Sequence, residues 1–412
     1  MARQILKQGD VDIEADDVRI VQLAGLTHDL GHGPMSHGFD NFVKRCGVTG
    51  WSHEEMSGKI LELLQENADM DLDSDDVRRI KELVHGMPPE HLAPERQGGG
   101  GLWRAGRRFL FDIVANKRNG VDVDKVDYLA RDSLMCGVRV GCDFDRLIKK
   151  GLYKVLDDEV CYPWSEYGNV LDLFRAREQM HRKVYTNRRC KVVELMTVDA
   201  LLAADPLLRL TERLDDPEEF LALDDTILTT IEHYHRLYRG NLDDREEKAL
   251  REAQAIVLRM RRREMYRFGN QFTVPIEYLV DKRWESMRRL FTPEEVASCY
   301  RGCDLPGGLQ PGDVICDENK IDHTMGGANP AERVGFFKEG SGGKFYISDT
   351  QVVGIMPSFF QERVLRVFTQ HTDERYIRAI EQALDGWRQK HFGGRAQLAT
   401  PRYSPPKRDE SS

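Results

Sequence analysis

The chain has 412 residues, 40% of them hydrophobic and 31% charged, which is typical of a globular protein with room for two or three structural units. Its formal net charge of −9 argues against a surface that is basic throughout, as in proteins that coat nucleic acid. No apolar run is long enough to span a bilayer and the N-terminus lacks a signal-peptide pattern, so we expect an intracellular protein without a membrane partner.

Apolar residues at helical spacing predict a series of helices in the first two thirds of the chain. The first covers residues 15–30 and has two aspartates at its N-terminal end, where the helix dipole favours them. Further helices are expected at residues 56–64, 77–84, 109–116, 124–131, 170–204 and 243–267. A glycine-rich run at residues 97–101 predicts a flexible surface loop.

The character of the sequence changes near Asn270. Residues 272–276 look extended, and two aromatic and β-branched segments around the glycines at 340–343 predict a hairpin of residues 334–337 and 344–347. Two more helices are expected at residues 359–369 and 373–389. The fold class is therefore mostly α, with a helical lobe over residues 1–268, a smaller α+β region over 269–392 and a disordered polar tail over 393–412.

Eight cysteines are scattered along the chain without any C-x-x-C pair, which is typical of free thiols in a reducing compartment. Cys299 and Cys303 would lie one turn apart in a helix, but that spacing alone does little to indicate a zinc site.

The most informative feature is a cluster of three histidines and one aspartate within ten residues: His28, Asp29, His32 and His37. Imidazole and carboxylate ligands together suit a borderline or hard divalent metal. The glycines and proline that follow the His-Asp pair break the helix, so the backbone can fold back and bring the later histidines beside it. A chance surface pair is the alternative for His28 and Asp29 alone.

A second informative segment, residues 116–132, holds four aspartates among apolar residues. Asp124, Tyr128 and Asp132 stand at i, i+4 and i+8, so they share one helix face. A solvated acidic face would account equally for Asp122 and Asp127. A carboxylate-bearing helix beside a histidine-rich turn is what a metal-dependent hydrolase needs.

These motifs, with residues 51–54 and 180–185, resemble the HD-domain metal phosphohydrolases. The likeness is greatest to the HD-domain dNTP triphosphohydrolases that also carry a sterile alpha motif, although no sterile-alpha-motif segment is seen here. It covers about residues 1–390 and is strongest before residue 205. It implies that residues 1–268 are an HD phosphohydrolase catalytic domain that hydrolyses dNTPs, dGTP included, to deoxynucleoside plus triphosphate.

The resemblance also implies a metal centre. The metal would be divalent, iron or zinc, held by His28, Asp29 and Asp124, with Mg²⁺ accompanying the substrate phosphates. The catalytic residues that it implies are His37, Asp40, His32 and His53. Among these, His37 would be the general acid toward the leaving oxygen and Asp40 would orient it, whereas His53 taken alone fits a structural histidine as well.

A substrate site is implied by the same resemblance. Its members are Lys125, Tyr128, Asp132, Arg177, His181 and Tyr185. The lysine and arginine would hold phosphates, the two tyrosines would pack on the sugar and crowd out a 2′-hydroxyl, and the aspartate would accept from the 3′-hydroxyl. His181 would lie near the base or sugar, although a solvated helix stripe would also explain Arg177, His181 and Tyr185.

The sequence departs from the family in two places. The family's fourth metal ligand is an upstream histidine, and no histidine precedes His28, so we expect a chain truncated at its N-terminus and nearly inactive as it stands. A truncated gene prediction, a genuine short isoform and a decayed enzyme would each explain this start. Residues 162–166 lack the basic contacts of the family's allosteric nucleotide site, with Arg146 the one match, which argues against activation by GTP. The resemblance further implies a homo-oligomer, dimer or tetramer, and a nuclear location, with the cytoplasm as the alternative.

Two alternatives remain at this stage. One is an HD phosphohydrolase acting on another nucleotide, against which Tyr128 and Tyr185 argue. The other is a catalytically decayed homologue that binds nucleotides or nucleic acid. The basic residues 259–263 would serve nucleic acid in that case, although a charged helix face accounts for them too.

Overall fold

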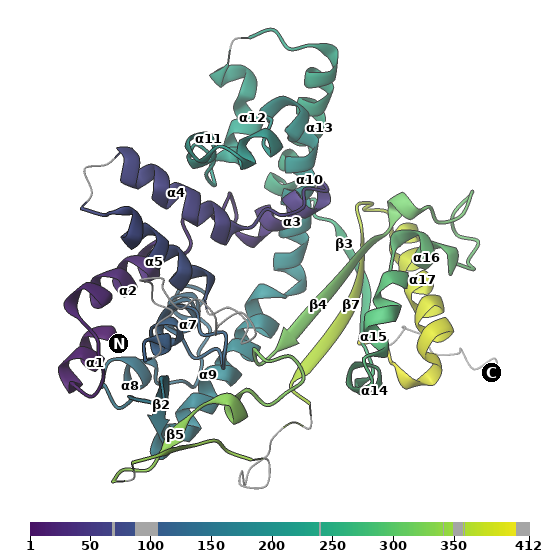
Figure 1. Cartoon of the computed structure of the whole chain (residues 1–412). Coiled ribbons are helices and arrows are strands. Elements are labelled where there is room, and N and C mark those ends of the chain that lie inside the picture. The colour runs from purple at the N-terminus through teal and green to yellow at the C-terminus, as the bar shows by residue number, and fades with distance from the viewer. Residues whose placement is uncertain are drawn as a thin grey trace. The chain divides into compact units, whose positions relative to one another are not determined.

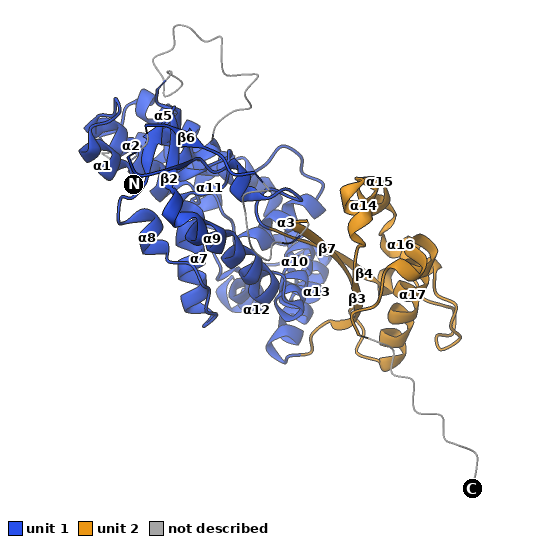
Figure 2. Ribbon diagram, turned by 90° about the horizontal axis from the view of Figure 1, so that it is seen from below, with its two compact units in different colours: residues 1–263, 323–358 blue, residues 264–322, 359–412 orange. Residues whose placement is uncertain are grey.

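The computed structural model describes residues 1–67, 71–86, 106–238, 240–340, 342–348, 357 and 359–400. It forms two compact units (Figure 2): unit 1 is Met1–Arg263 with His323–Ser358, and unit 2 is Glu264–Asp322 with Phe359–Ser412. Helices predominate and strands are a smaller part, as predicted. Residues 323–358, which we assigned to the C-terminal region, belong to unit 1. The predicted loop at residues 97–101 lies outside the described residues.

Four helices of unit 1 carry the site (Figure 1): α2 (Ala15–Thr27), α3 (His37–Arg45), α4 (His53–Asn67) and α7 (Val123–Met135). The start of α2 is fixed by Asp17, whose carboxylate accepts a hydrogen bond from the Glu14 backbone N–H at 3.0 Å. It ends at Thr27, three residues before the predicted end, just ahead of the glycine- and proline-containing turn. Asp122 caps α7 by accepting from the Lys125 backbone N–H at 2.9 Å.

The other helices of unit 1 are α1 (Ala2–Gln8), α5 (Ser74–His85), α6 (Phe111–Val114), α8 (Phe144–Ile148), α9 (Tyr167–Met180), α10 (Arg188–Leu208), α11 (Pro217–Leu221), α12 (Ile227–Leu237) and α13 (Asp244–Arg261). Its short 3₁₀ turns are Arg108–Leu110, Trp164–Glu166, Thr211–Leu214 and Pro330–Arg333. The single helix predicted over residues 170–204 is in fact α9 and α10, separated by a π-helical turn at His181–Tyr185.

Two apolar cores hold the site helices in place. Ile20 and Ala24 of α2 and Leu129 of α7 are fully buried in one core, so the helices that carry the His-Asp pair and Asp124 are packed together. Phe39 of α3 and Ile60 of α4 belong to the other core. The candidate site therefore draws its residues from helices of both cores.

A small sheet in unit 1 has the order β1-β2-β5-β6. Its strands are β1 (Lys154–Leu156), β2 (Glu159–Pro163), β5 (Phe336–Phe337) and β6 (Lys344–Phe345). The strands β5 and β6 are antiparallel, so the predicted hairpin is confirmed, while β2 and β5 run parallel.

Unit 2 is an antiparallel sheet of order β3-β7-β4, with β3 (Arg267–Thr273), β4 (Ile315–Asp322) and β7 (Gln361–Thr369). Its helices are α14 (Ile276–Val280), α15 (Arg283–Met287), α16 (Pro293–Ser298) and α17 (Glu374–Phe392), with 3₁₀ turns at Arg288–Leu290, Pro311–Asp313 and Gly393–Arg395. The last predicted helix is confirmed as α17. Of the extended segment predicted at residues 272–276, only residues 272 and 273 belong to β3, and α14 already begins at Ile276.

The helix predicted at residues 359–369 is wrong, because this segment is the central strand β7. Its apolar residues Val364, Leu365, Val367 and Phe368 are buried, and both of its edges pair with neighbouring strands. The predicted tail is also shorter than expected, since Arg388 donates a hydrogen bond to the Gly393 carbonyl at 3.2 Å and residues up to 400 contact unit 2. Residues 401–412 lie outside the described residues.

Among the residues that the structure describes, no helix is both long and apolar enough to cross a membrane. Cys299 and Cys303 do not share a helix, because α16 ends at Ser298.

Candidate metal and nucleotide site

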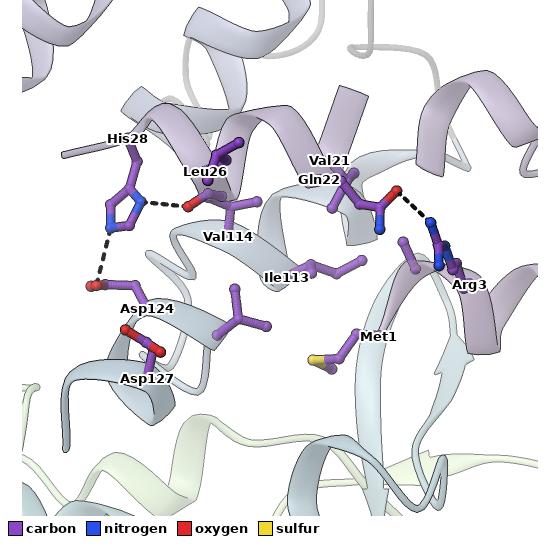
Figure 3. A pocket seen from close by; sticks show the side chains of 13 residues that line it. Met1, Arg3, Val21, Gln22, Leu26, His28, Ile113, Val114, Asp124 and Asp127 are labelled. Atoms are coloured by element: carbon purple, nitrogen blue, oxygen red, sulfur yellow. Dashed lines mark hydrogen bonds and ion pairs between the residues drawn. The ribbon is translucent and has the colours of Figure 1, made fainter. Parts of the chain in front are cut away.

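The His-Asp pair sits where α2 ends. The Nδ1 of His28 lies 2.9 Å from the Gly25 carbonyl, to which only an N–H can donate, so Nε2 is left free to accept. That Nε2 lies 3.2 Å from a carboxylate oxygen of Asp124 on α7 (Figure 3). A carboxylate oxygen of Asp29 lies at the same distance from it, 3.2 Å. A backbone carbonyl that orients an imidazole in this way is a common arrangement behind metal-binding histidines.

His28, Asp29 and Asp124 form a trio of candidate ligands, and their charges favour the binding of a cation. Hydrogen bonds to Asp124 and Asp29 raise the pKa of His28 to about 10, because without a metal the two carboxylates draw a proton onto the ring. One ligand atom from each of the three residues lies within 4.8 Å of the others. One imidazole and two carboxylates are a donor set that a divalent metal accepts, so the residues fit the metal that an HD-type centre requires.

Three further histidines gather beside the trio. The rings of His32 and His53 stack at 4.0 Å between centroids, and the ring of His37 stands edge-on to His32 at 5.1 Å. Asp40 links two of them, with its Oδ2 at 3.0 Å from His37 Nδ1 and 3.4 Å from His53 Nδ1. Burial alone would raise the pKa of Asp40, but these two partners hold it well below its usual range.

The exposure of these histidines differs in a way that matters for chemistry. The His37 side chain is 78% exposed, whereas those of His53 and Asp40 are 20% and 12% exposed. Burial also lowers the pKa of His32, which favours a neutral ring. The exposed His37, held by a buried carboxylate, is thus the histidine best able to meet a group arriving from solvent.

The turn before His37 is held in a strained shape. Met35 and Ser36 have φ values of 62° and 50°, in the left-handed region that non-glycine residues seldom adopt. A contact from far along the chain supports it, since the Met35 backbone N–H donates to Asp225 Oδ1 at 2.7 Å. Nothing in the sequence pattern pointed to Asp225.

The exposed face of α7 meets the π-helical turn. The Tyr185 hydroxyl donates to Asp132 Oδ2 at 2.7 Å, and the rings of Tyr128 and Tyr185 lie 6.3 Å apart. His181 stands edge-on to Tyr185 at 5.1 Å, and Arg177 hydrogen-bonds Tyr128, whose pKa is raised above its usual value mainly by burial. The π turn aims Tyr185 at Asp132, and π turns occur often at functional sites.

Lys125 is placed differently from the other implied substrate residues. Its amine donates to the Gly120 carbonyl at 2.6 Å and the residue is 7% exposed. In this arrangement the lysine closes the loop before α7, and it does not face the exposed side of that helix.

A cavity of about 490 Å³ adjoins the trio (Figure 3). His28, Asp124 and Asp127 form its polar end, and the side chains of α1, α2 and α6, among them Leu26 and Ile113, form its apolar wall. The sequence pattern did not indicate that Asp127 would line a cavity, because the position of this residue suggested only a solvated helix face.

The residues and their geometry agree with the comparisons to known proteins. Residues 1–132 match the HD domain family model. This part of the chain is therefore similar to the HD domain family. HD domains hold a divalent metal, and the trio of His28, Asp29 and Asp124 is the candidate centre in this one.

Several curated relatives are similar over most of this chain. One is the deoxynucleoside triphosphate triphosphohydrolase SAMHD1 homolog of Dictyostelium discoideum, 32% identical over 89% of this chain and 64% of its own length. The SAMHD1 proteins named deoxynucleoside triphosphate triphosphohydrolase from Bos taurus and Homo sapiens are 32% and 31% identical, over 92% of this chain and 66% and 62% of theirs. The chain thus spans a little under two thirds of the length of these relatives.

Proposed function

We propose that this protein hydrolyses deoxynucleoside triphosphates to a deoxynucleoside and triphosphate. The observation that carries the proposal is that α7 bears both Asp124 of the trio and, two turns further on, Asp132, which accepts a hydrogen bond from Tyr185 of the π-helical turn. One helix would therefore carry both the carboxylate that binds the metal near the phosphates and the carboxylate that contacts the sugar. The names of the relatives support the same reaction.

In the proposed reaction, water attacks the α-phosphorus and the bond to the 5′-oxygen breaks. A divalent metal held by the trio supplies Lewis acidity for the charge that develops on the phosphate. The departing 5′-oxygen needs a proton, and the exposed His37, oriented by Asp40, is within the site to donate it. His32 and His53 line the wall behind it.

The sugar would be selected by a second group of residues, Tyr128, Asp132 and Tyr185. Tyr185 lies beside Tyr128 and donates a hydrogen bond to Asp132. In the proposed complex Asp132 would accept from the 3′-hydroxyl, and the two rings would crowd out a 2′-hydroxyl. Arg177 and His181 would meet the phosphates and the base or sugar. Lys125, tied to the Gly120 carbonyl, would contribute a positive charge near the phosphates and no direct contact.

The family resemblance extends the proposal. Iron or zinc is the metal proposed for the trio, with Mg²⁺ accompanying the phosphates, and dGTP is proposed among the substrates. A homo-oligomer and a nuclear location are proposed on the same ground. Size-exclusion chromatography with light scattering tests the first of these two, and imaging of the tagged protein tests the second.

The experiment that tests the function is incubation of the metal-loaded protein with dGTP, followed by chromatographic separation of nucleoside and phosphate products. Formation of deoxyguanosine and triphosphate in equal amounts is expected, at a low rate because no histidine precedes His28 to act as the family's fourth metal ligand. The matched control is Asp124→Asn, which keeps the size of the side chain and removes its charge, and which should abolish turnover.

A further inference from the structure

The buried hydroxyl of Ser57 hydrogen-bonds backbone groups before and after Asp29. Ser57 of α4 is 2% exposed, and its Oγ donates to the His28 carbonyl at 2.7 Å and accepts from the Gly31 N–H at 2.8 Å. The turn itself supplies the bonds from Leu30 N–H to Thr27 and from His32 N–H to Asp29, at 3.3 and 3.2 Å. Ser57 adds the pair of contacts that brackets the carboxylate.

The same turn lies in backbone contact with α4. A Cβ added at Gly31 would collide with the His53 carbonyl and the Ser57 backbone nitrogen. No side chain therefore separates the two segments, and the Ser57 hydroxyl fixes their spacing directly. Helix C-termini leave backbone carbonyls without intrahelical partners, and here the hydroxyl satisfies one of them.

The three members of the trio are anchored independently. His28 is oriented by the Gly25 carbonyl within α2, and Asp124 is carried by α7. Asp29 lies beyond the end of α2, in the turn, so its direction depends on whatever holds that turn.

We propose that Ser57 is a positioning residue for the metal centre, which it serves by fixing the peptide group that precedes Asp29 and the peptide group that precedes Gly31. It touches neither the metal nor the substrate and acts through the turn. This inference rests on the metal centre of the proposed function.

The test is titration of the full chain with Co²⁺ alone, read by affinity and by the visible absorption spectrum of the bound ion, which reports coordination geometry. Ser57→Ala removes both hydrogen bonds, and we expect about 10–100-fold weaker binding, the range seen when groups that orient metal ligands are lost, together with an altered spectrum. Ser57→Thr keeps the hydroxyl and should restore the affinity and spectrum of the wild type.

A matched control lies on the same helix. Ser52 accepts from the Glu55 N–H at 3.2 Å and caps α4, so Ser52→Ala weakens the helix without touching the turn. We expect Ser52→Ala to lower thermal stability and to leave Co²⁺ affinity and spectrum unchanged. If Ser57→Ala does not fold, Ser57→Cys, which nearly preserves volume and hydrogen-bonds weakly, takes its place with the same expected loss.

Three results would overturn the inference. Equal Co²⁺ affinity and spectrum in wild type and Ser57→Ala would remove the positioning role while leaving the metal centre intact. An equal loss in Ser52→Ala would show that the effect is general destabilisation. Failure of the wild type to bind Co²⁺ would remove the metal centre itself, and the role of Ser57 with it.

Discussion

Replacing Gly31 with alanine tests the close approach on which the site depends. The new Cβ would fall on the His53 carbonyl and the Ser57 backbone nitrogen, atoms that cannot rotate away as a flexible side chain could. Either α4 or the turn must therefore move. Overpacking of this kind typically costs 1–3 kcal/mol, and a clash with backbone on one side places this site near the upper end, at about 3 kcal/mol.

The matched control is Gly25→Ala, six residues earlier in α2. A Cβ at Gly25 meets nothing within 4 Å, and the residue lies inside a helix. Alanine is favoured over glycine there by roughly 0.5–1 kcal/mol, so this variant should be slightly more stable than the wild type. The same chemical change at two nearby glycines is thus expected to have opposite signs.

The assay is thermal unfolding of metal-free protein, followed by measurement of bound metal after loading. Gly31→Ala should lower the unfolding midpoint by roughly 5–10 °C and reduce bound metal, because the displaced turn carries Asp29 away from Asp124. Gly25→Ala should raise the midpoint slightly and retain metal. A Gly31→Ala variant that melts with the wild type and holds metal normally would refute the contact between the turn and α4.

Three further predictions concern the site. Asp124→Asn should lose most of the bound metal with little loss of secondary structure, as measured by elemental analysis and circular dichroism; wild-type metal content would exclude this ligand. Tyr185→Ala removes the hydrogen bond to Asp132 and the ring proposed to crowd out a 2′-hydroxyl, so the rate on GTP relative to dGTP should rise at least about tenfold. An unchanged ratio would contradict the proposed role of Tyr185 in selecting the sugar. Asp225→Ala should lower kcat for dGTP about tenfold with little change in KM, because the strained Met35 turn loses its support, while Asp225→Asn keeps an acceptor oxygen and most of the activity; equal kcat in both variants would argue against this support.

The parts of the site that a short segment encodes could be predicted. His28 and Asp29 are adjacent, and Asp124, Tyr128 and Asp132 follow a helical repeat, so their grouping depends on one helix end and one helix face. The juxtaposition of these two segments is tertiary, and only the family resemblance suggested it. The functional roles of these residues remain predictions.

The supporting contacts could not be predicted. Ser57 meets the turn 26 residues before it and Asp225 meets Met35 across 190 residues, and neither residue belongs to a periodic pattern. A hydroxyl or carboxylate that hydrogen-bonds a distant backbone group produces no recognisable pattern in the sequence around it.

The periodicity of apolar residues also failed to predict two elements of the fold, β7 and the π turn. The segment that forms β7 has a short apolar run that fits a helix or a buried strand, and only its pairing with β3 and β4 decides between them. The π turn at His181–Tyr185 was missed because it interrupts a continuous helical pattern without a glycine or proline.

The proposed reaction of this protein breaks the bond between the α-phosphorus and the 5′-oxygen of a dNTP. Its most direct test is turnover of dGTP by metal-loaded protein in H₂¹⁸O, with both products analysed by mass spectrometry. The account predicts unlabelled deoxyguanosine and triphosphate that carries one ¹⁸O atom. Deoxyguanosine monophosphate with diphosphate as products, or label in the deoxyguanosine, would contradict it.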